Sequence, residues 1–184
     1  MASIDFTNME VWTPKGLVTF YVLVAMHLKT RRVKIAGITP YPDGDWVRQM
    51  TRDLTNVEDG FLLHQSYVLV DRDTKFLPLR EYLTSCSEVE PVVLPPRSPN
   101  LNAHLERFMR SLKHECLNRM IFFGPTSLQK ALKEYAEHYH HERNHQGLKN
   151  RIPFPGKDVG VLDGGVDCSE RLGGLLRYYH RNAA

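Results

Sequence analysis

The sequence has few cysteines, no long apolar run and no low-complexity segment, and these absences exclude several classes of protein. Only three of its 184 residues are cysteine, at 86, 116 and 168, and none forms a C-x-x-C pair. A disulfide framework or cysteine zinc site is therefore not expected, and a reducing cytosol fits best. The most apolar run, FYVLVAM at 20–26, is far too short to span a bilayer. The opening MASIDFTNMEVW carries acids where a signal peptide needs cations, so we expect neither secretion nor membrane insertion.

The composition is that of a soluble globular domain, but the charge is unevenly divided. Hydrophobic residues make up 42% and charged residues 24%, which argues against disorder. Residues 1–96 contain 10 Lys and Arg against 12 Asp and Glu, whereas residues 97–151 contain 10 against 5. Six of the nine histidines also lie in that middle segment. A basic middle segment favours a face that binds a polyanion, although this signal alone is weak.

Local patterns predict three antiparallel strands, then helix, strand, helix, strand and further helices. We expect strands at 4–12, 17–28, 31–40, 66–71 and 89–95, and helices at 43–56, about 78–85, 98–117 and about 127–142, the last ended by Gly147. This order predicts an α/β fold in which helices flank a mixed sheet. We expect a catalytic core over residues 1–150 and a C-terminal extension over 151–184, with a hairpin at VDCSERLGGLLRYYHR.

The helix in SPNLNAHLERFMRSLKHECL, residues 98–117, carries an acid beside its apolar stripe. The stripe has the helical spacing i, i+3, i+4, i+7 and i+11 and consists of Leu105, Phe108, Met109, Leu112 and Cys116. Glu106 lies about 100° from the start of that stripe, with Arg110 and Lys113 at i+4 and i+7. One interpretation is a solvated face with an ordinary Glu–Arg pair, and the other is a functional acid.

Two other acids stand at expected strand positions. Asp5 lies in the first strand, and Asp71 ends the fourth. These strands would be neighbours in a sheet of this order, so the two carboxylates could lie side by side. Gathered carboxylates repel one another unless a divalent cation lies between them. Mg²⁺ and Mn²⁺ prefer such oxygen ligands, and two ions about 3.5–4 Å apart promote in-line phosphoryl transfer.

Over nearly its whole length, the chain resembles the transposases of bacterial insertion sequences and the retroviral-type integrases, and four stretches carry the resemblance. They are IDFTNMEVWT, LVDRDTKF, SPNLNAHLERFMRSLKHECL and EYAEHYHHERNHQGLKNRIP. The resemblance implies a ribonuclease-H-like core with a five-stranded mixed sheet in the order 3-2-1-4-5. It also implies a D, D, E triad that binds two Mg²⁺ or Mn²⁺ ions, at Asp5, Asp71 and Glu106. The implied activity is DNA cleavage and strand joining.

The resemblance also implies partners. We expect contacts to DNA, both element ends and target, from Arg107, Arg110, Lys113 and Arg143, although Arg143 has a packing role as its alternative. A homo-oligomer in the bacterial cytoplasm, associated with the nucleoid, is expected. The chain begins four residues ahead of Asp5. The DNA-binding region that precedes the core in this family is therefore expected to be missing or encoded as a separate helix-turn-helix protein in an adjacent reading frame.

Several alternatives stay open on the sequence. Asp73 is a rival to Asp71 as a metal ligand, because two positions along an extended chain return to the same face. Histidines 138, 141 and 145 have a spacing that could bind zinc, against which a polar helix face is the simpler interpretation. Many relatives carry an acid where this chain has His27. A catalytically inert remnant that binds DNA or a partner, and a purely hydrolytic nuclease, are the alternative functions.

Overall fold

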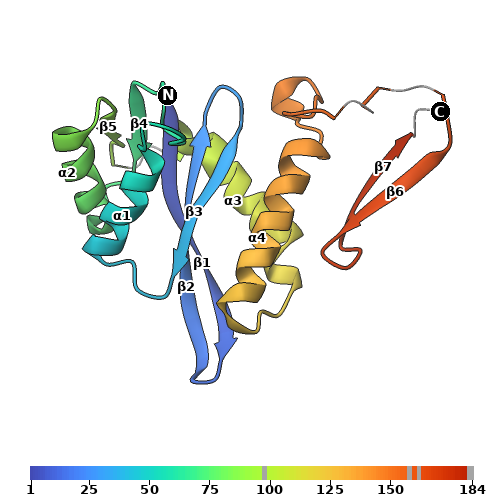
Figure 1. The fold of residues 1–184 in the computed structure, drawn as a ribbon, viewed down its shortest axis with the longest axis horizontal. Coiled ribbons are helices and arrows are strands. Elements are labelled where there is room, and N and C mark those ends of the chain that lie inside the picture. Colours follow the sequence, from blue (N-terminus) through green and yellow to red (C-terminus); the bar gives the residue numbers. More distant parts are fainter. Residues whose placement is uncertain (97–98, 157–158, 161–162, 182–184) are drawn as a thin grey trace.

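A five-stranded mixed sheet forms the centre of the protein (Figure 1). The computed structural model describes residues 1–96, 99–156, 159–160 and 163–181. The strands are β1 (Ala2–Thr13), β2 (Gly16–His27), β3 (Val33–Thr39), β4 (Tyr67–Val70) and β5 (Glu90–Val93). Their order is β3-β2-β1-β4-β5, with β1, β2 and β3 antiparallel and β4 and β5 parallel to β1. The predicted sheet and its order are confirmed.

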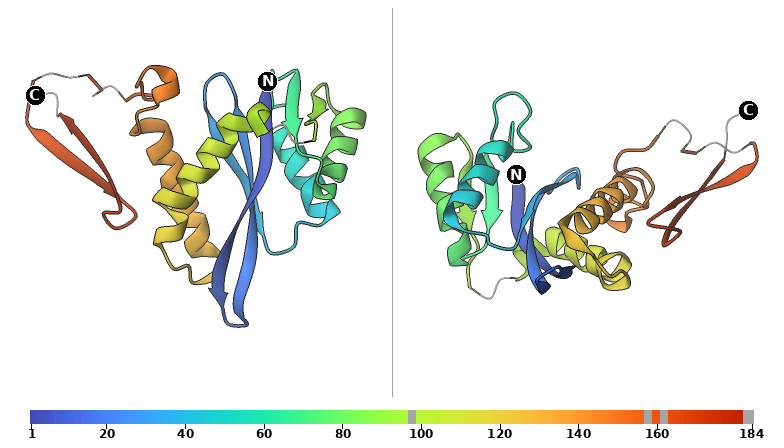
Figure 2. Two further views of the ribbon diagram at one scale, coloured as in Figure 1. Left: turned by 180° about the vertical axis from the view of Figure 1, so that it is seen from behind. Right: turned by 60° about the horizontal axis from the view of Figure 1, so that its bottom comes forward.

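Helices cover both faces of this sheet, as expected for a ribonuclease-H-like arrangement. One face carries α1 (Gly44–Leu54) and α2 (Leu77–Cys86), and the other carries α3 (Ala103–Glu115) and α4 (Gly124–His141). The left view of Figure 2 shows α3 in front of the sheet, crossing β1 from a start close to the N-terminus. No helix in the described ranges is both long and apolar enough to cross a membrane.

Alternating burial along β1 divides its side chains between the two helical layers. Ala2 and Ile4 belong to the hydrophobic cluster under α1 and α2, whereas Val11 belongs to the cluster under α3 and α4. Asp5 has the same parity as Val11, so its carboxylate projects toward the α3 layer. The strand periodicity therefore decides that the first acid of the predicted triad faces the helix that carries the third.

The N-terminal end agrees with the sequence for α1 but not for α4. Asp43 is the N-cap of α1, and its carboxylate accepts a 2.9 Å hydrogen bond from the Trp46 amide. The helix predicted from about 127 to 142 begins three residues earlier than expected, whereas its end agrees to within one residue. The helix begins at Gly124, because Pro125 occupies its first turn, where a missing N–H costs nothing. It ends at His141, and Gly147 lies in a separate 3-10 helix, Gln146–Leu148.

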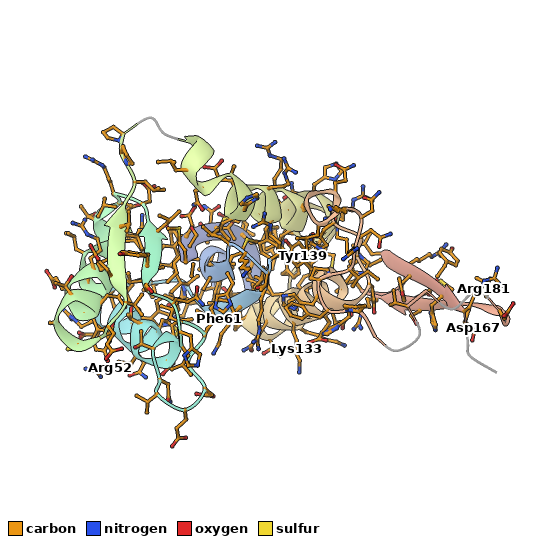
Figure 3. All side chains as sticks on the ribbon, turned by 90° about the horizontal axis from the view of Figure 1, so that it is seen from above. Arg52, Phe61, Lys133, Tyr139, Asp167 and Arg181 are labelled. Atoms are coloured by element: carbon orange, nitrogen blue, oxygen red, sulfur yellow. The ribbon has the colours of Figure 1, made fainter. Side chains whose placement is uncertain are left out.

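The C-terminal hairpin forms its own two-stranded sheet, β6 (Val166–Arg171) paired with β7 (Leu176–Arg181). The prediction of this hairpin is confirmed. Its turn end is attached to the core, since Leu176 is buried in the cluster under α4 and the Leu172 amide donates to Glu134 at 2.8 Å. Figure 3 shows Asp167 and Arg181 at the other end of the hairpin, away from the central sheet.

Candidate acidic active site

Asp5 and Asp71 come from neighbouring parallel strands at matching positions. Ala2 lies opposite Val68 and Ser3 lies opposite Leu69 in the β1–β4 ladder. Two residues further along the same register, Asp5 comes opposite Asp71, which directly follows β4. Parallel strands keep their residues in step, so the two carboxylates project from the same face of the sheet. The expectation that the strands bearing these acids are neighbours is confirmed.

The two acids line a cleft of about 400 Å³ between the sheet and α3. Four parts of the chain form its walls: β1, β2, the segment after β4, and α3. The lining residues are Asp5, Phe6, Thr7, Asn8, Tyr21, Asp71, Asp73, Lys75, Phe76, Met109, Arg110 and Lys113. The acidic groups come from β1 and the segment after β4, whereas the cationic groups come from α3, with Arg110 and Lys113, and from the segment after β4, with Lys75.

The Asp5 carboxyl lies in an environment that disfavours its charge. Burial raises its pKa from an ordinary value of 3.8 to about 6, partly opposed by a 2.7 Å hydrogen bond from the Phe6 amide. The nearby charges of Asp71, Glu106 and Asp73 raise the pKa further. Asp71 accepts a 2.6 Å hydrogen bond from the Arg72 amide. Within the described part of the chain, neither Asp5 nor Asp71 has a cationic partner.

Glu106 lies in the first turn of α3 and is half-buried. Its charge acts on Asp5, so the two side chains are within electrostatic range of each other. A buried hydrogen bond fixes the start of this helix against β1, from the Ser3 hydroxyl to the Asn102 side-chain oxygen at 2.6 Å. Ser3 lies two residues before Asp5 on the same strand face, and Asn102 lies four residues before Glu106. This hydrogen bond therefore aligns the two elements that carry the acids.

The acid pair has the chemistry of a divalent-cation site. Asp5 and Asp71 offer carboxylate oxygens without a counter-charge, and Mg²⁺ and Mn²⁺ prefer such hard oxygen donors. Across the described ranges, however, no three His, Cys, Asp or Glu side chains are grouped closely enough to hold one ion. The pair fits a metal ion, but Glu106 does not complete a three-ligand set in this conformation.

Asp73 also lines the cleft, but its carboxylate is occupied by Lys75. It caps the 3-10 helix Thr74–Phe76, accepting hydrogen bonds of 2.9 Å from both the backbone amide and the Nζ of Lys75. These bonds lower the pKa of Asp73 below its ordinary value. Its place in the structure is thus that of a capping residue that holds Lys75 beside the acid pair.

Lys75, Tyr21 and Thr7 are cleft residues that the sequence reasoning missed. The Lys75 ammonium lies 5.8 Å from the centre of the Tyr21 ring, and Tyr21 belongs to the second strand. The Thr7 hydroxyl is buried and has no hydrogen-bond partner among the described residues. Thr7 lies at i+2 from Asp5 and could have been found from strand periodicity. Nothing local marks Tyr21, because its place depends on the pairing of β2 with β1.

The four cations predicted to contact DNA divide into two sets. Arg110 and Lys113 line the acidic cleft, and the Lys113 ammonium also donates to Asn8 at 3.4 Å. Arg107 and Arg143 instead line a second cavity, on another face of α3. Arg143 is held by a 2.6 Å ion pair with Glu115.

The predicted histidine spacing does not produce a metal site. The three side chains diverge to separate partners: His138 to Glu142 at 2.9 Å, His141 to the Phe154 carbonyl at 2.8 Å, and His145 to the Tyr139 carbonyl at 3.0 Å. His27 lies outside the acidic cleft. Its ring stacks on Phe61 with centroids 4.1 Å apart and donates to the Phe61 carbonyl at 2.5 Å. These histidines support the packing of the chain.

Comparison with known proteins was made by family, by sequence and by structure. Residues 87–153 match the family model described as integrase core domain. This range contains Glu106 and the four predicted DNA-contacting cations, but neither Asp5 nor Asp71. A comparison with curated protein sequences found no significant match.

A solved structure has the same fold. The chain is similar to a chain in the cryoEM structure of a simian T-cell lymphotropic virus intasome in complex with PP2A regulatory subunit B56 gamma. The TM-score is 0.55 at 12% sequence identity, and the match covers 98% of this chain and 66% of the other. The chain thus spans slightly less than two thirds of the length of that relative. With residues 87–153 matching the integrase core domain family, the protein has the fold of an integrase or transposase catalytic core.

Proposed function

We propose that this chain carries out metal-dependent polynucleotidyl transfer on DNA, namely strand cleavage and strand joining. The observation that carries the proposal is the pair of carboxylates without counter-charge, Asp5 and Asp71, on neighbouring parallel strands. The integrase core domain match over residues 87–153 supports the same chemistry. The cationic α3 side of the cleft also supports it, since a phosphodiester needs such groups beside the acids.

Asp5, Asp71 and Glu106 are the residues we assign to hold Mg²⁺ or Mn²⁺, with two ions in the active complex. When bound, the metal would activate the attacking oxygen and stabilise the leaving oxygen of an in-line displacement at phosphorus. Approach of Glu106 to the acid pair is part of this proposal. Asp5 must lose its proton before its carboxylate can bind a cation, so its raised pKa makes metal binding weaker below about pH 6.

The remaining charged residues of the cleft would bind and orient the DNA strand. Arg110 and Lys113 would contact backbone phosphates next to the acids, and Lys75 would add a third positive charge, held in place by Asp73. Such contacts position a strand without reading its sequence. We therefore expect DNA binding that is independent of sequence and strongly sensitive to salt.

The proposed biological unit is larger than this chain. We propose that it acts as a homo-oligomer on mobile-element ends and target DNA, in the nucleoid of a bacterial cytoplasm. Recognition of the ends is assigned to a helix-turn-helix protein from an adjacent reading frame.

A second candidate is a catalytically inert core that binds DNA or a partner without cutting it. One observation favours it: over the described residues, no three side chains are grouped to hold a metal ion. A purely hydrolytic nuclease is the remaining variant of the first proposal, because the same acids would activate water in place of a DNA 3′-hydroxyl.

A single assay separates these functions. The purified chain is incubated with labelled duplex DNA that carries a pre-cut end, with Mg²⁺, with Mn²⁺ or with EDTA, beside Asp71→Asn, Glu106→Gln and Asp73→Asn. We expect metal-dependent cleavage and joining by the wild type. Removing a residue that only orients a metal ligand lowers activity by roughly 10–100-fold. Asp71→Asn and Glu106→Gln change the proposed ligands themselves, so they should lower activity by more than this. Asp73→Asn is the matched control and should be milder.

The other outcomes each assign one of the alternatives. Cleavage without joining of the pre-cut end identifies a hydrolytic nuclease. Salt-sensitive DNA binding without any cleavage, in the wild type as in Asp71→Asn, identifies the inert core. Full activity of Asp71→Asn would show that the acid assignment is wrong.

A further inference from the structure

A second cavity, of about 290 Å³, lies on another face of α3 from the acids. Four parts of the chain form it: the turn between β2 and β3, α3, the end of α4, and the segment that follows α4. Its lining residues are Arg31, His104, Arg107, Phe108, Ser111, Tyr139, Arg143, Asn144, His145, Gln146, Gly147 and Leu148. Arg107 follows Glu106 directly and is turned about 100° from it around the helix axis. The cavity is at the lower end of the size range of ligand pockets.

The charge of this cavity is positive and is only partly compensated. Arg31, Arg107 and Arg143 line it, whereas none of its described lining residues is Asp or Glu. Glu115 neutralises Arg143 through the 2.6 Å ion pair from outside the lining. Arg107 has no hydrogen-bond or ion-pair partner in the described ranges. Two positive charges therefore remain without a counter-charge in one small cavity.

Arg31 is the most unusual member of this group. Its Nη2 donates a 2.9 Å hydrogen bond to Nε2 of His104. Its Nη1 is buried, and no described residue accepts a hydrogen bond from it. A buried guanidinium N–H without an acceptor is unfavourable. Burial lowers the pKa of Arg31, partly opposed by Tyr139, and the nearby charge of Arg107 lowers it further, so the two guanidinium groups lie close enough to repel each other.

An oxyanion in the cavity would remove both unfavourable features at once. It would accept a hydrogen bond from Arg31 Nη1 and supply the missing negative charge beside Arg107. Arginine forks match the oxygens of phosphate particularly well. We propose that the cavity formed by Arg31, His104, Arg107 and Arg143 is a binding site for one phosphate group, separate from the acidic cleft.

The phosphate has two possible sources, the backbone of the DNA strand and a free phosphate compound. The DNA source rests on the proposed function, because it requires a strand that crosses α3 from the acidic cleft. A helix is about 10–12 Å across and the phosphates of each duplex strand rise about 3.4 Å along the duplex axis, so a strand crossing α3 would reach the cavity within a few phosphates of the acids. The free phosphate source requires no DNA binding.

The salt dependence of DNA binding tests the first source. The affinity for a short duplex is measured across a series of salt concentrations for the wild type, Arg31→Gln, Arg107→Gln and the double variant. Each phosphate contact contributes about 0.9 to the slope of log affinity against log salt. We expect each single variant to lower the slope by about one. The double variant should lower it by no more, because both arginines bind the same phosphate.

Lys133→Gln is the charge-matched control. Lys133 is exposed on α4 and points away from the sheet (Figure 3), so its loss should leave the slope unchanged. Arg31→Lys keeps the positive charge but not the two-pronged hydrogen bonding, and should keep the slope while weakening affinity. Thermal unfolding of each variant, without DNA, shows whether it folds as the wild type does.

Inorganic phosphate tests the second source without DNA. We expect phosphate, at constant ionic strength, to raise the unfolding temperature of the wild type and Lys133→Gln, but not that of folded Arg31→Gln or Arg107→Gln. Stabilisation by phosphate with no change in the DNA slope would assign the site to a free phosphate compound. Slopes and phosphate responses equal to those of the wild type in both variants, or a slope lowered by two in the double variant, would overturn the proposal. Neither measurement requires cleavage activity, so an inert chain tests the site equally well.

Discussion

The Ser3 hydroxyl donates a buried 2.6 Å hydrogen bond to the Asn102 side chain, and this bond joins the first strand to the start of α3. Asn102 is the N-cap residue of that helix, but its side chain caps no helix amide. It is turned instead toward the strand that carries Asp5. An asparagine at this position ordinarily stabilises the start of its helix. Asn102 instead aligns α3 with β1, the two elements that carry Glu106 and Asp5.

Ser3→Ala should weaken this alignment. It leaves the Asn102 side-chain oxygen buried without a donor, which should lower the free energy of unfolding by about 1–3 kcal/mol. Urea denaturation measures this loss. Thr7→Val is a control on the same face of β1, because it removes a buried hydroxyl that has no partner among the described residues. Its stability should stay equal or rise slightly, and equal losses in the two variants would contradict the role of the hydrogen bond.

Divalent metal should stabilise the folded chain through the acid pair. A ligand that binds only the folded state at a hundred times its Kd stabilises it by about 2.7 kcal/mol, a shift of several degrees for a chain of this size. We expect Mg²⁺ or Mn²⁺ to raise the Tm of the wild type but not that of Asp5→Asn or Asp71→Asn. Asp73→Asn should respond as the wild type does, since the Asp73 carboxylate is already paired with Lys75. Scanning calorimetry with and without EDTA checks this.

Stability without metal should fall as pH rises through the range in which Asp5 titrates. Burial raises the pKa of Asp5 from 3.8 to about 6, so the folded state binds its proton more tightly than the unfolded state does. This contribution is fully present below about pH 4 and is lost as pH rises to about 6. Above that pH, Asp5→Asn should be more stable than the wild type by up to about 3 kcal/mol.

The pH dependence of the wild type alone does not isolate Asp5, because His140 titrates in the same pH range. The wild type must therefore be compared with Asp5→Asn. Burial lowers the pKa of His140 from 6.5 to about 4, so its contribution to stability has the opposite sign and is lost as pH falls through the same range. The total stability therefore mixes the two trends. Urea denaturation in EDTA at pH 4, 5, 6 and 7 should show the difference between Asp5→Asn and wild type increasing with pH. A constant difference would contradict the burial of the Asp5 charge.

Arg171 should hold the C-terminal hairpin against α4. Burial would raise the pKa of Glu142, but hydrogen bonds from Arg171, at 2.7 Å, and from His138 keep it below its ordinary value. Arg171→Ala leaves this carboxylate with a single partner, which should cost about 1–2 kcal/mol and increase hydrogen exchange in β6 and β7. Arg177→Ala breaks an exposed 3.0 Å pair within the hairpin, with Glu170, and should not change exchange measurably. Equal exchange in the two variants would contradict this attachment.

Much of the fold could be predicted from the sequence because its signals act over a few residues. Three such signals are the strand alternation in β1, the apolar stripe of α3 and the N-cap at Asp43. Each depends only on residues that are close in the sequence. The order of these elements predicts a mixed sheet in which the strands of Asp5 and Asp71 are neighbours, and the family resemblance implies the same strand order. Local spacing was sufficient wherever a single element determined which way a side chain points.

Contacts between distant segments decided the rest. The sequence placed Arg107 with Arg110 on one helix, but packing of the β2–β3 turn and the segment after α4 assigned them to different cavities. Glu142 is the residue that follows α4, and its partner Arg171 lies in the distant hairpin. Lys75 and Tyr21 meet beside the acids only because β2 pairs with β1. Burial and electrostatic environment are sums over all neighbours in space, so they become determined only when the tertiary structure brings those neighbours together.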